Sequence, residues 1–360
     1  MASINVSSIY SRVFILRGIP DLESSHVWIS IPLFIMFVLA ISGNLLMLLL
    51  IKMEPRLHNP MYYFLSTLSL TDLVLSSSIS LKMLSIFWLN HNEIFFLSCL
   101  VQMFFIHCFT SLESGVLMAM AFDRYMAICN PLHYTSALTN TLIVKIVMSL
   151  VIRGIVIVTP CPWMASRLPY CQSLHIPHSY CDHMAVVKLA CTDTTINSAY
   201  GLTVVLIVIV FDVSSIAVSY VFILRTILRL SSANSKNKAF GTCTSHISII
   251  VMFYTLGLFS FLTHRIGHIA LYIHVMLSFL YLLIPPTLNP IIYGVRTQEI
   301  RTAALHYAHG DRGSKLTTHL IKKRKDAQFI KSIKTRFTDL IYPIPLSQRL
   351  CLSTINLVPE

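Results

Sequence analysis

The sequence predicts an all-α membrane protein, a bundle of seven transmembrane helices. Hydrophobic residues make up 55% of the 360 residues and charged residues only 12%, and seven long apolar stretches follow one another. The mean hydropathy is +0.71. A soluble domain usually has about a quarter of its residues charged. The composition therefore excludes a soluble globular protein, a disordered chain, a collagen-like chain and a disulfide-rich secreted domain.

The first four stretches are each long enough to cross a membrane, which takes about 20 residues of helix. The first has 28 consecutive residues, 24–51, without an acidic or basic side chain. We expect the next three spans at about 59–84, 99–124 and 142–163, where Asp72, Glu113 and Arg153 lie within apolar surroundings.

The last three spans are expected at about 195–224, within 239–264 and within 266–295. The fifth contains Asp212. The seventh contains Pro285, Pro286 and Pro290, and because proline has no backbone N–H these residues predict a kink. After the seventh span we expect a short amphipathic helix on the cytoplasmic side.

The loops predict the orientation of the chain. Lys52 and Arg56 follow the first span and four Lys and Arg residues lie in 225–238, whereas 85–98 contains none. Basic loops stay in the cytoplasm, so the N-terminus is expected outside the plasma membrane and the C-terminus inside. Residues 1–25 are then an extracellular segment in which Asn5 begins a glycosylation sequon, 26–295 the seven-transmembrane domain, and 296–360 a cytoplasmic tail.

The net charge of +12 is concentrated in that tail. Residues 296–360 contain 12 Lys and Arg and 5 Asp and Glu, a balance of +7. Basic residues beside apolar spans usually reflect membrane topology. We therefore expect the lipid bilayer as a partner and no nucleic acid.

Five strings of residues resemble those of olfactory receptors, which are rhodopsin-like, class A G-protein-coupled receptors. They occur in the family's order at 60–73, 120–132, 219–220, 238–246 and 286–294. The long loop between the fourth and fifth spans, together with His264 and Arg265, resembles the class I, or fish-like, branch. No nucleotide-binding loop, zinc-protease helix or nucleophile elbow is evident, so an enzyme is not expected.

The resemblance implies a receptor that binds a small volatile odorant, with a carboxylic acid as the expected class. It further implies activation of an olfactory-type stimulatory G protein that raises cAMP. Two alternatives stay open. The chain continues to Glu360, further than is usual in the family, which would suit a pseudogene-like receptor that is not exported. A seven-span channel or transporter has less support, because neither a pore-lining charge series nor an internal repeat is evident.

The resemblance also implies residues that couple activation to the G protein. Asp123 can hold Arg124 in an inactive pair, and breaking the pair frees the guanidinium. The simpler alternative is an arginine that follows the positive-inside rule. The same resemblance assigns activation roles to Tyr125, Tyr220, Asn289, Pro290 and Tyr293.

Asp72 and Glu113 are carboxyl groups about midway through their spans, where an isolated charge is costly. The resemblance places both beside Asn44 and Asn289, where a sodium ion could bind between carboxylate and amide oxygens. Alternatively the two carboxyl groups share a proton. Other cofactors and a metal centre are not expected.

Four of the nine cysteines lie on the side expected to be oxidising, and four cysteines allow three pairings. The resemblance implies the pairs Cys99–Cys181 and Cys171–Cys191. A metal site formed by Cys181 and His183 is the rival interpretation, although no regular ligand spacing supports it.

Ligand binding is expected at the outer third of the spans. A guanidinium can bind a carboxylate through two parallel hydrogen bonds, and the resemblance gives this role to Arg265; the alternative is a side chain that snorkels to the interface. His107 and His183 could line the same pocket, although His107 could equally be a histidine satisfied within the bundle. The apolar wall is expected to include Phe104, Phe261 and Leu262.

Overall fold

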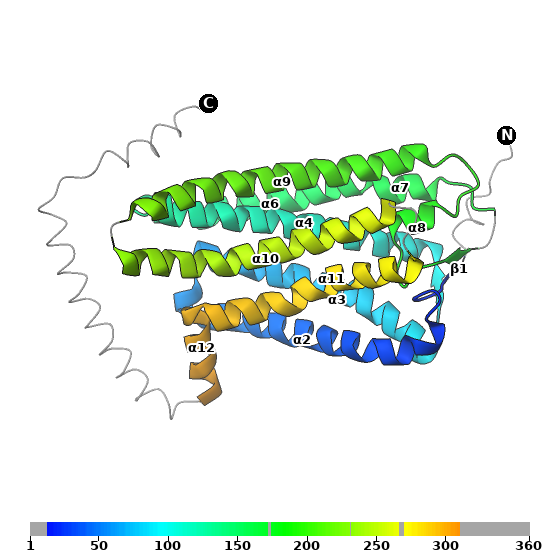
Figure 1. Cartoon of the computed structure of the whole chain (residues 1–360), viewed down its shortest axis with the longest axis horizontal. Coiled ribbons are helices and arrows are strands. Elements are labelled where there is room, and N and C mark those ends of the chain that lie inside the picture. The colour runs from blue at the N-terminus through cyan, green and yellow to red at the C-terminus, as the bar shows by residue number, and fades with distance from the viewer. Residues whose placement is uncertain (1–12, 172–173, 231, 266–269, 310–360) are drawn as a thin grey trace, which may run out of the picture.

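The computed structural model describes residues 13–171, 174–230, 232–265 and 270–309. Within these residues, seven helices are long and apolar enough to cross a membrane, as predicted. They lie side by side along the long axis of the molecule (Figure 1). Their bounds are α2 His26–Met53, α3 Pro60–Leu89, α4 Phe96–Cys129, α6 Asn140–Val158 continued by α7 Pro160–Ser166, α9 Thr195–Arg229, α10 Ala233–Arg265 and α11 Leu271–Arg296.

The short elements lie at the two ends of the bundle. At one end, which we call the α12 end, α5 (Tyr134–Ala137) and η2 (Pro55–Leu57) connect helices, and α12 (Gln298–His309) lies across the bundle axis (Figure 1). This is the short helix expected after the seventh span. At the other end, the sheet end, lie η1 (Glu23–Ser25), α8 (His183–Val187) and three strands.

Local sequence explains several helix boundaries. Pro60 is the first residue of α3, a position at which proline breaks no hydrogen bond. The Thr139 side chain accepts a hydrogen bond from the Leu142 N–H and caps α6. Pro160 cannot continue the backbone hydrogen bonding of α6 and instead begins α7, so the predicted fourth span is two consecutive helices.

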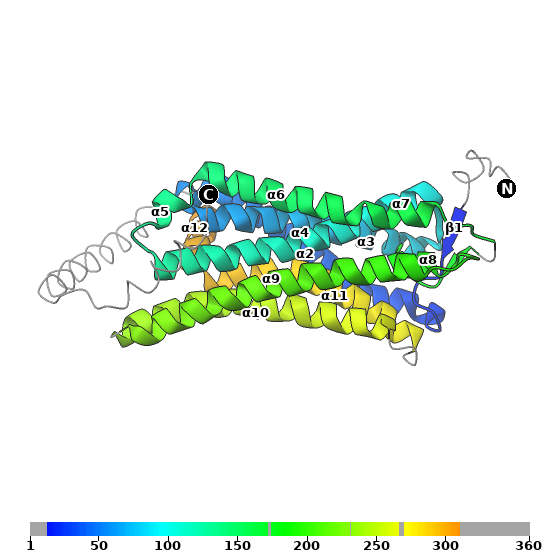
Figure 2. The same ribbon diagram turned by 90° about the horizontal axis from the view of Figure 1, so that it is seen from above.

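The central helix is α4, which packs against α3, α6 and α9 (Figure 2). One buried hydrophobic cluster lies toward the sheet end and includes Phe14, Phe96 and Phe279. Others lie toward the α12 end, around residues such as Phe64 and Ile223. Many outward-facing leucines, isoleucines and valines of α2, α6 and α9 remain exposed, as expected for surfaces that contact lipid.

A small three-stranded sheet at the sheet end was not predicted. Strand β1 (Val13–Leu16) lies between β2 (Glu93–Phe95), to which it is antiparallel, and β3 (His175–Ile176), to which it is parallel. Its inward side chains, Phe14 and Leu16, are completely buried. Within the segment 1–25, which was predicted to be extracellular, strand β1 therefore packs on the bundle and pairs with the loops that contain β2 and β3.

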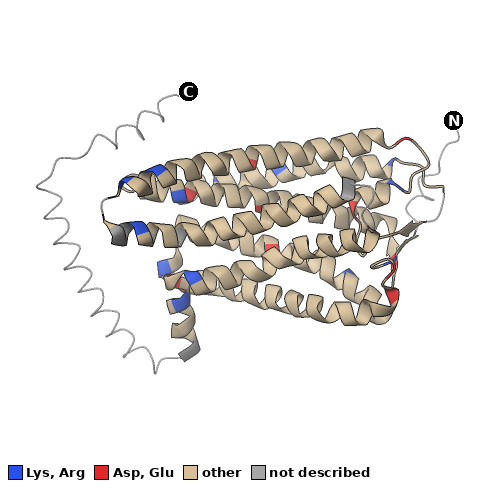
Figure 3. Ribbon diagram, viewed as in Figure 1, with Lys and Arg blue, Asp and Glu red and all other residues tan. Residues whose placement is uncertain are grey.

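Charge is distributed unevenly along the bundle. Lysines and arginines gather at the α12 end, on α9, α10, α11 and α12 (Figure 3). A few acidic side chains lie midway along the helices. The two ends of the molecule therefore present different charge to their surroundings.

Candidate ligand pocket and activation site

A cavity of about 230 Å³ lies in the half of the bundle nearer the sheet end. Its walls come from α4, α9, α10 and α11, and the loop before α8 closes it above. A concave, mostly apolar space with a few polar groups is the usual form of a small-molecule site. The cavity is therefore the candidate ligand pocket.

The loop over the pocket is held at several points. A disulfide joins Cys181 to Cys99 on α4, and the Cys181 N–H donates to Gln102 Oε1 at 3.0 Å. Asp182 Oδ2 accepts hydrogen bonds from the Met184 and Ala185 N–H groups at the start of α8. A second disulfide joins Cys171 to Cys191. Because Cys181 is bonded to another sulfur, it offers no thiolate to a metal site with His183.

Three of the residues predicted to bind ligand line the pocket: His107, His183 and Phe261. The rings of His107 and His183 meet edge to face, with their centroids 6.5 Å apart. Phe104 and Leu262 do not line it. Phe104 packs against the ring of Phe105, and Leu262 is 40% exposed on the outside of α10.

Arg265 is the last residue of α10. Its side chain lies outside the described residues, as do Asn5 and the tail beyond His309. The predicted roles of these groups stay predictions.

Sequence reasoning missed a set of polar lining residues on α4. Thr110, Ser111 and Ser114 line the pocket together with His107. They lie three, four and seven residues after His107, the spacing that places residues on one helix face. That periodicity was the available signal.

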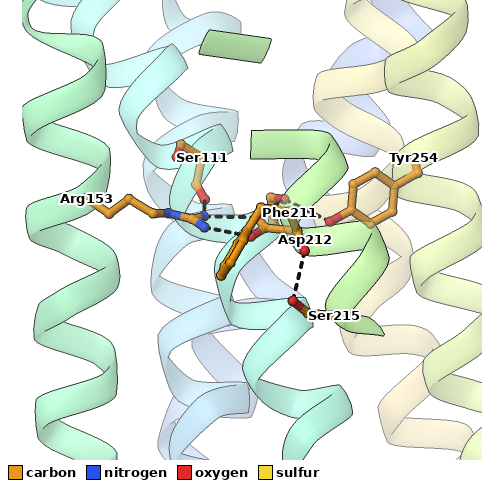
Figure 4. Close-up of polar contacts among 7 residues, drawn as sticks. Ser111, Arg153, Phe211, Asp212, Ser215 and Tyr254 are labelled. Carbon is orange, nitrogen blue, oxygen red and sulfur yellow. Dashed lines mark hydrogen bonds and ion pairs between the residues drawn. The ribbon is translucent and has the colours of Figure 1, made fainter. Parts of the chain in front are cut away.

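Below the pocket, a buried ion pair links three helices. Arg153 on α6 donates to both carboxylate oxygens of Asp212 on α9, at 2.6 and 2.9 Å, and to the Ser111 carbonyl oxygen on α4 at 3.0 Å (Figure 4). Ser114 donates to Asp212 at 2.6 Å and lies 2.8 Å from the Tyr254 hydroxyl on α10. Arg153 and Asp212, the charged residues within the fourth and fifth spans, therefore pair with each other.

Three residues of the predicted ion site, Asp72, Glu113 and Asn289, interact with one another, and Asn44 bonds to α11, the helix that holds Asn289. Asn289 Nδ2 donates to Asp72 Oδ2 at 2.9 Å, while Asn44 Nδ2 donates to the carbonyl oxygens of Ala40 and Pro286. Asn289 also interacts with Glu113. Four buried oxygens have no hydrogen-bond partner among the described residues: Asn44 Oδ1, Asp72 Oδ1, Glu113 Oε1 and Asn289 Oδ1. Oxygen-only ligands of this kind suit a hard cation.

At the α12 end, Arg124 and Asp123 form an ion pair of 2.5 Å. The Tyr134 hydroxyl on α5 donates to the other Asp123 oxygen at 2.8 Å. Burial, and then the nearby Asp123 charge, raise the pKa of Tyr134 above its ordinary value, so the hydroxyl keeps its proton and remains a donor.

Among the other predicted activation residues, the three tyrosines lie near this pair, on α4, α9 and α11. The Tyr220 hydroxyl is 2.8 Å from His246 Nδ1, which joins α9 to α10. Tyr293 is buried and directs its hydroxyl toward Met120 Sδ, and Tyr125 packs against Phe222. His246 is the last residue of the string 238–246, and no role is predicted for it from the sequence.

A seven-helix bundle with a covered pocket at one end and an Asp-Arg-Tyr sequence at the other has the architecture of a rhodopsin-like receptor. Comparison with known proteins narrows the class. A sequence profile of the olfactory receptor family matches residues 33–309.

Individual members of that family agree with the profile match. Human olfactory receptor 52N2 is 48% identical over 316 residues, which cover 87% of this chain and 98% of that receptor. Human olfactory receptor 52K2 is 49% identical over 85% of this chain and 98% of that receptor. Human olfactory receptor 52K1 is 50% identical over 84% of this chain and 96% of that receptor. The chain therefore belongs to the olfactory receptor family, in its class I branch, and is a multi-pass membrane receptor rather than an enzyme.

Proposed function

We propose that this odorant receptor binds a small carboxylic acid in the cavity below α8 and activates a stimulatory G protein that raises cAMP. The observation that carries the proposal is the covered cavity with two imidazole rings, His107 and His183, in its wall. Imidazoles can hydrogen bond to or pair with a carboxylate. Arg265, at the end of α10, would add a bidentate guanidinium.

The proposed orientation puts the sheet end outside the cell and the α12 end in the cytoplasm. The gathering of lysines and arginines at the α12 end supports it. So do the two disulfides at the sheet end, because disulfides persist in oxidising surroundings.

Activation is proposed to run from the pocket to Arg124. Ser111 and Ser114 line the pocket and also contact the Arg153–Asp212 pair, which joins α4, α6 and α9. A ligand that binds better to one arrangement of these helices shifts the equilibrium toward it. Release of Arg124 from Asp123 at the α12 end would then open a surface for the G protein.

We also propose that sodium binds between Asp72, Glu113, Asn44 and Asn289. The ion would neutralise buried carboxylate charge and hold α2, α3, α4 and α11 in one arrangement. Thermal unfolding of the purified receptor in NaCl and in choline chloride tests this. A higher Tm in sodium that Asp72→Asn abolishes is expected, and equal values in both salts would favour a shared proton instead.

The main test is cAMP accumulation in cells that express the chain with the olfactory G protein, screened against short and medium carboxylic acids. Surface labelling is measured in parallel, which separates a silent receptor from one that is not exported. Arg265→Ala should weaken the acid response at equal surface expression. Arg167→Ala is the matched control, because Arg167 stacks on Trp163 at the same end of the bundle and does not line the cavity.

A dose-dependent response that Arg265→Ala leaves unchanged would exclude the guanidinium as the acid-binding group. Good surface labelling without a response to any acid would exclude carboxylic acids as the ligand class.

A further inference from the structure

A row of polar side chains on α4 runs down one wall of the cavity. His107, Thr110, Ser111 and Ser114 all line it. Ser114 is engaged, because it donates to Asp212 and contacts Tyr254. The other three residues each present a buried polar atom, His107 Nε2, Thr110 Oγ1 and Ser111 Oγ, with no hydrogen-bond partner in the part of the chain that the structure describes.

Thr110 and Ser111 differ from most serines and threonines of the other spans. A hydroxyl in a transmembrane helix usually donates to the carbonyl oxygen one turn earlier. Thr67, Thr203 and Ser215 do so, at 3.0, 2.8 and 2.8 Å. The hydroxyls of Thr110 and Ser111 are not tied to the backbone of α4 in this way, although Ser111 is only 7% exposed.

Buried hydroxyl groups without a hydrogen-bond partner are energetically unfavourable. A buried donor or acceptor left unsatisfied destabilises the folded chain, so each one calls for a specific explanation. A ligand that hydrogen bonds to them recovers this free energy, whereas a purely apolar ligand does not. Unsatisfied atoms in a pocket wall therefore select for polar ligand groups at their position.

The rest of the lining indicates which kind of polar group fits. On α9, the cavity is lined by Val204, Val205, Val208 and Ile209. No lysine or arginine occurs among the lining residues that the structure describes. Two hydroxyls in a wall that offers no cationic lysine or arginine suit a neutral oxygen, a hydroxyl or a carbonyl, rather than a carboxylate.

We propose that Thr110 and Ser111 form a deep hydrogen-bonding subsite that takes the second oxygen function of an odorant carrying two. The first would lie at His107 and His183, as in the proposed function, on which this inference rests. Ser111 is one turn of α4 beyond His107, about 6 Å along the helix axis. The receptor should therefore prefer short diols or hydroxy acids to the corresponding compounds with one oxygen group.

The test measures binding without the G protein. The full chain is purified into lipid nanodiscs, and the shift in thermal unfolding is titrated with pentane-1,5-diol and with 1-pentanol. Wild-type receptor should bind the diol about fivefold more tightly, the ratio that one added hydrogen bond of about 1 kcal/mol gives. Thr110→Val combined with Ser111→Ala should abolish this preference and leave the pentanol affinity unchanged.

Two further variants make the result specific. Thr203→Val with Ser215→Ala removes the same two kinds of hydroxyl from α9 positions outside the cavity lining and should keep the preference for the diol. Thr110→Ser with Ser111→Thr retains both hydroxyls and should also keep the preference for the diol. Loss of the preference in this variant would indicate that substitution at these positions disturbs the fold.

Three results would overturn the subsite: equal binding of both probes to wild-type receptor, binding of neither probe, or loss of the preference in the α9 control as well. The proposed signalling function fails separately. A preference for the diol that depends on Thr110 and Ser111, without any cAMP response, would support the subsite and refute G-protein activation.

Discussion

The two halves of the bundle use buried polar groups in opposite ways. In the half that holds the cavity, His107, Thr110 and Ser111 point polar atoms into the pocket with no partner among the residues described. In the half toward α12, Asp123 is bonded to both Arg124 and Tyr134. The cavity half offers hydrogen-bonding groups to a ligand. In the half toward α12, the polar groups are paired with each other and keep Arg124 bound to Asp123.

The ion pair of Arg153 and Asp212 lies between these halves, and Ser111 and Ser114 connect it directly to the pocket wall. Substitutions in the Arg153–Asp212 pair should therefore destabilise the folded bundle, because the pair joins helices. Substitutions around Asp123 and Arg124, at the α12 end, should instead alter the balance between inactive and active states.

The largest effect is expected from Asp212→Ala. It leaves Arg153 as an unpaired charge within the membrane, and breaking a buried pair from one side costs about 3–5 kcal/mol. We expect a sharp loss of surface expression and a lower Tm of the purified receptor. The double variant Arg153→Met, Asp212→Leu removes both charges and should recover most of the Tm. A single variant that unfolds at the wild-type temperature would show that the pair does not hold the two halves together.

The second largest effect is expected from removing the disulfides of the pocket half, one at a time. Cys99–Cys181 closes a sequence separation of 82 residues and Cys171–Cys191 one of 20. In the chain-entropy account, their removal costs about 4.5 and about 3 kcal/mol, respectively. Paired Cys→Ser variants should rank in this order in thermal unfolding. Only loss of Cys99–Cys181 should also weaken ligand affinity, since it frees the loop over the pocket; equal losses of affinity would contradict that role.

Hydropathy predicted the spans well because each span is a long, nearly uncharged stretch. The second span, expected at 59–84, is α3 (Pro60–Leu89), and the sixth, expected within 239–264, extends to Ala233–Arg265. The sheet escaped prediction because strands of four, three and two residues are too short to show alternation.

Which side chains line the pocket was harder to predict, for a physical reason. Lipid-facing and bundle-facing positions are both apolar, so hydropathy does not distinguish them. Phe104 and Leu262 were expected in the apolar wall and do not line it, whereas Phe261 does. Thr110 and Ser111 were missed because hydroxyls in a transmembrane helix ordinarily bond to their own backbone.

A smaller effect is expected from Tyr134→Phe at the closed end. The variant removes one hydrogen bond from Asp123, worth about 1 kcal/mol, and loosens the hold on Arg124. Basal cAMP should rise about fivefold without ligand, at unchanged surface expression. Tyr307→Phe is the control, because Tyr307 donates to the Met53 carbonyl oxygen at the same end without touching Asp123. Unchanged basal cAMP in Tyr134→Phe would mean that the ion pair alone holds Arg124.

The smallest effect concerns Asp193 at the sheet end, which accepts from the N–H and the hydroxyl of Thr195 at the start of α9, at 2.9 and 2.6 Å. These hydrogen bonds lower the pKa of Asp193 below its ordinary value. A carboxyl group whose pKa is lower in the folded than in the unfolded chain stabilises the fold above the unfolded pKa. This contribution is lost as the pH falls through the lowered pKa.

Asp193 is fully exposed, so the contribution should be small and weakened by salt. Asp193→Ala should slightly lower the Tm at neutral pH and match wild type in strong acid. The comparison is a series of Tm measurements from about pH 7 to about pH 3, a range that spans the ordinary aspartate pKa. A deficit that persists unchanged at the acid end would show that the side chain acts by packing rather than by its charge. Because it lies outside both the pocket and the Arg124 pair, this variant should leave ligand potency and basal cAMP at wild-type values.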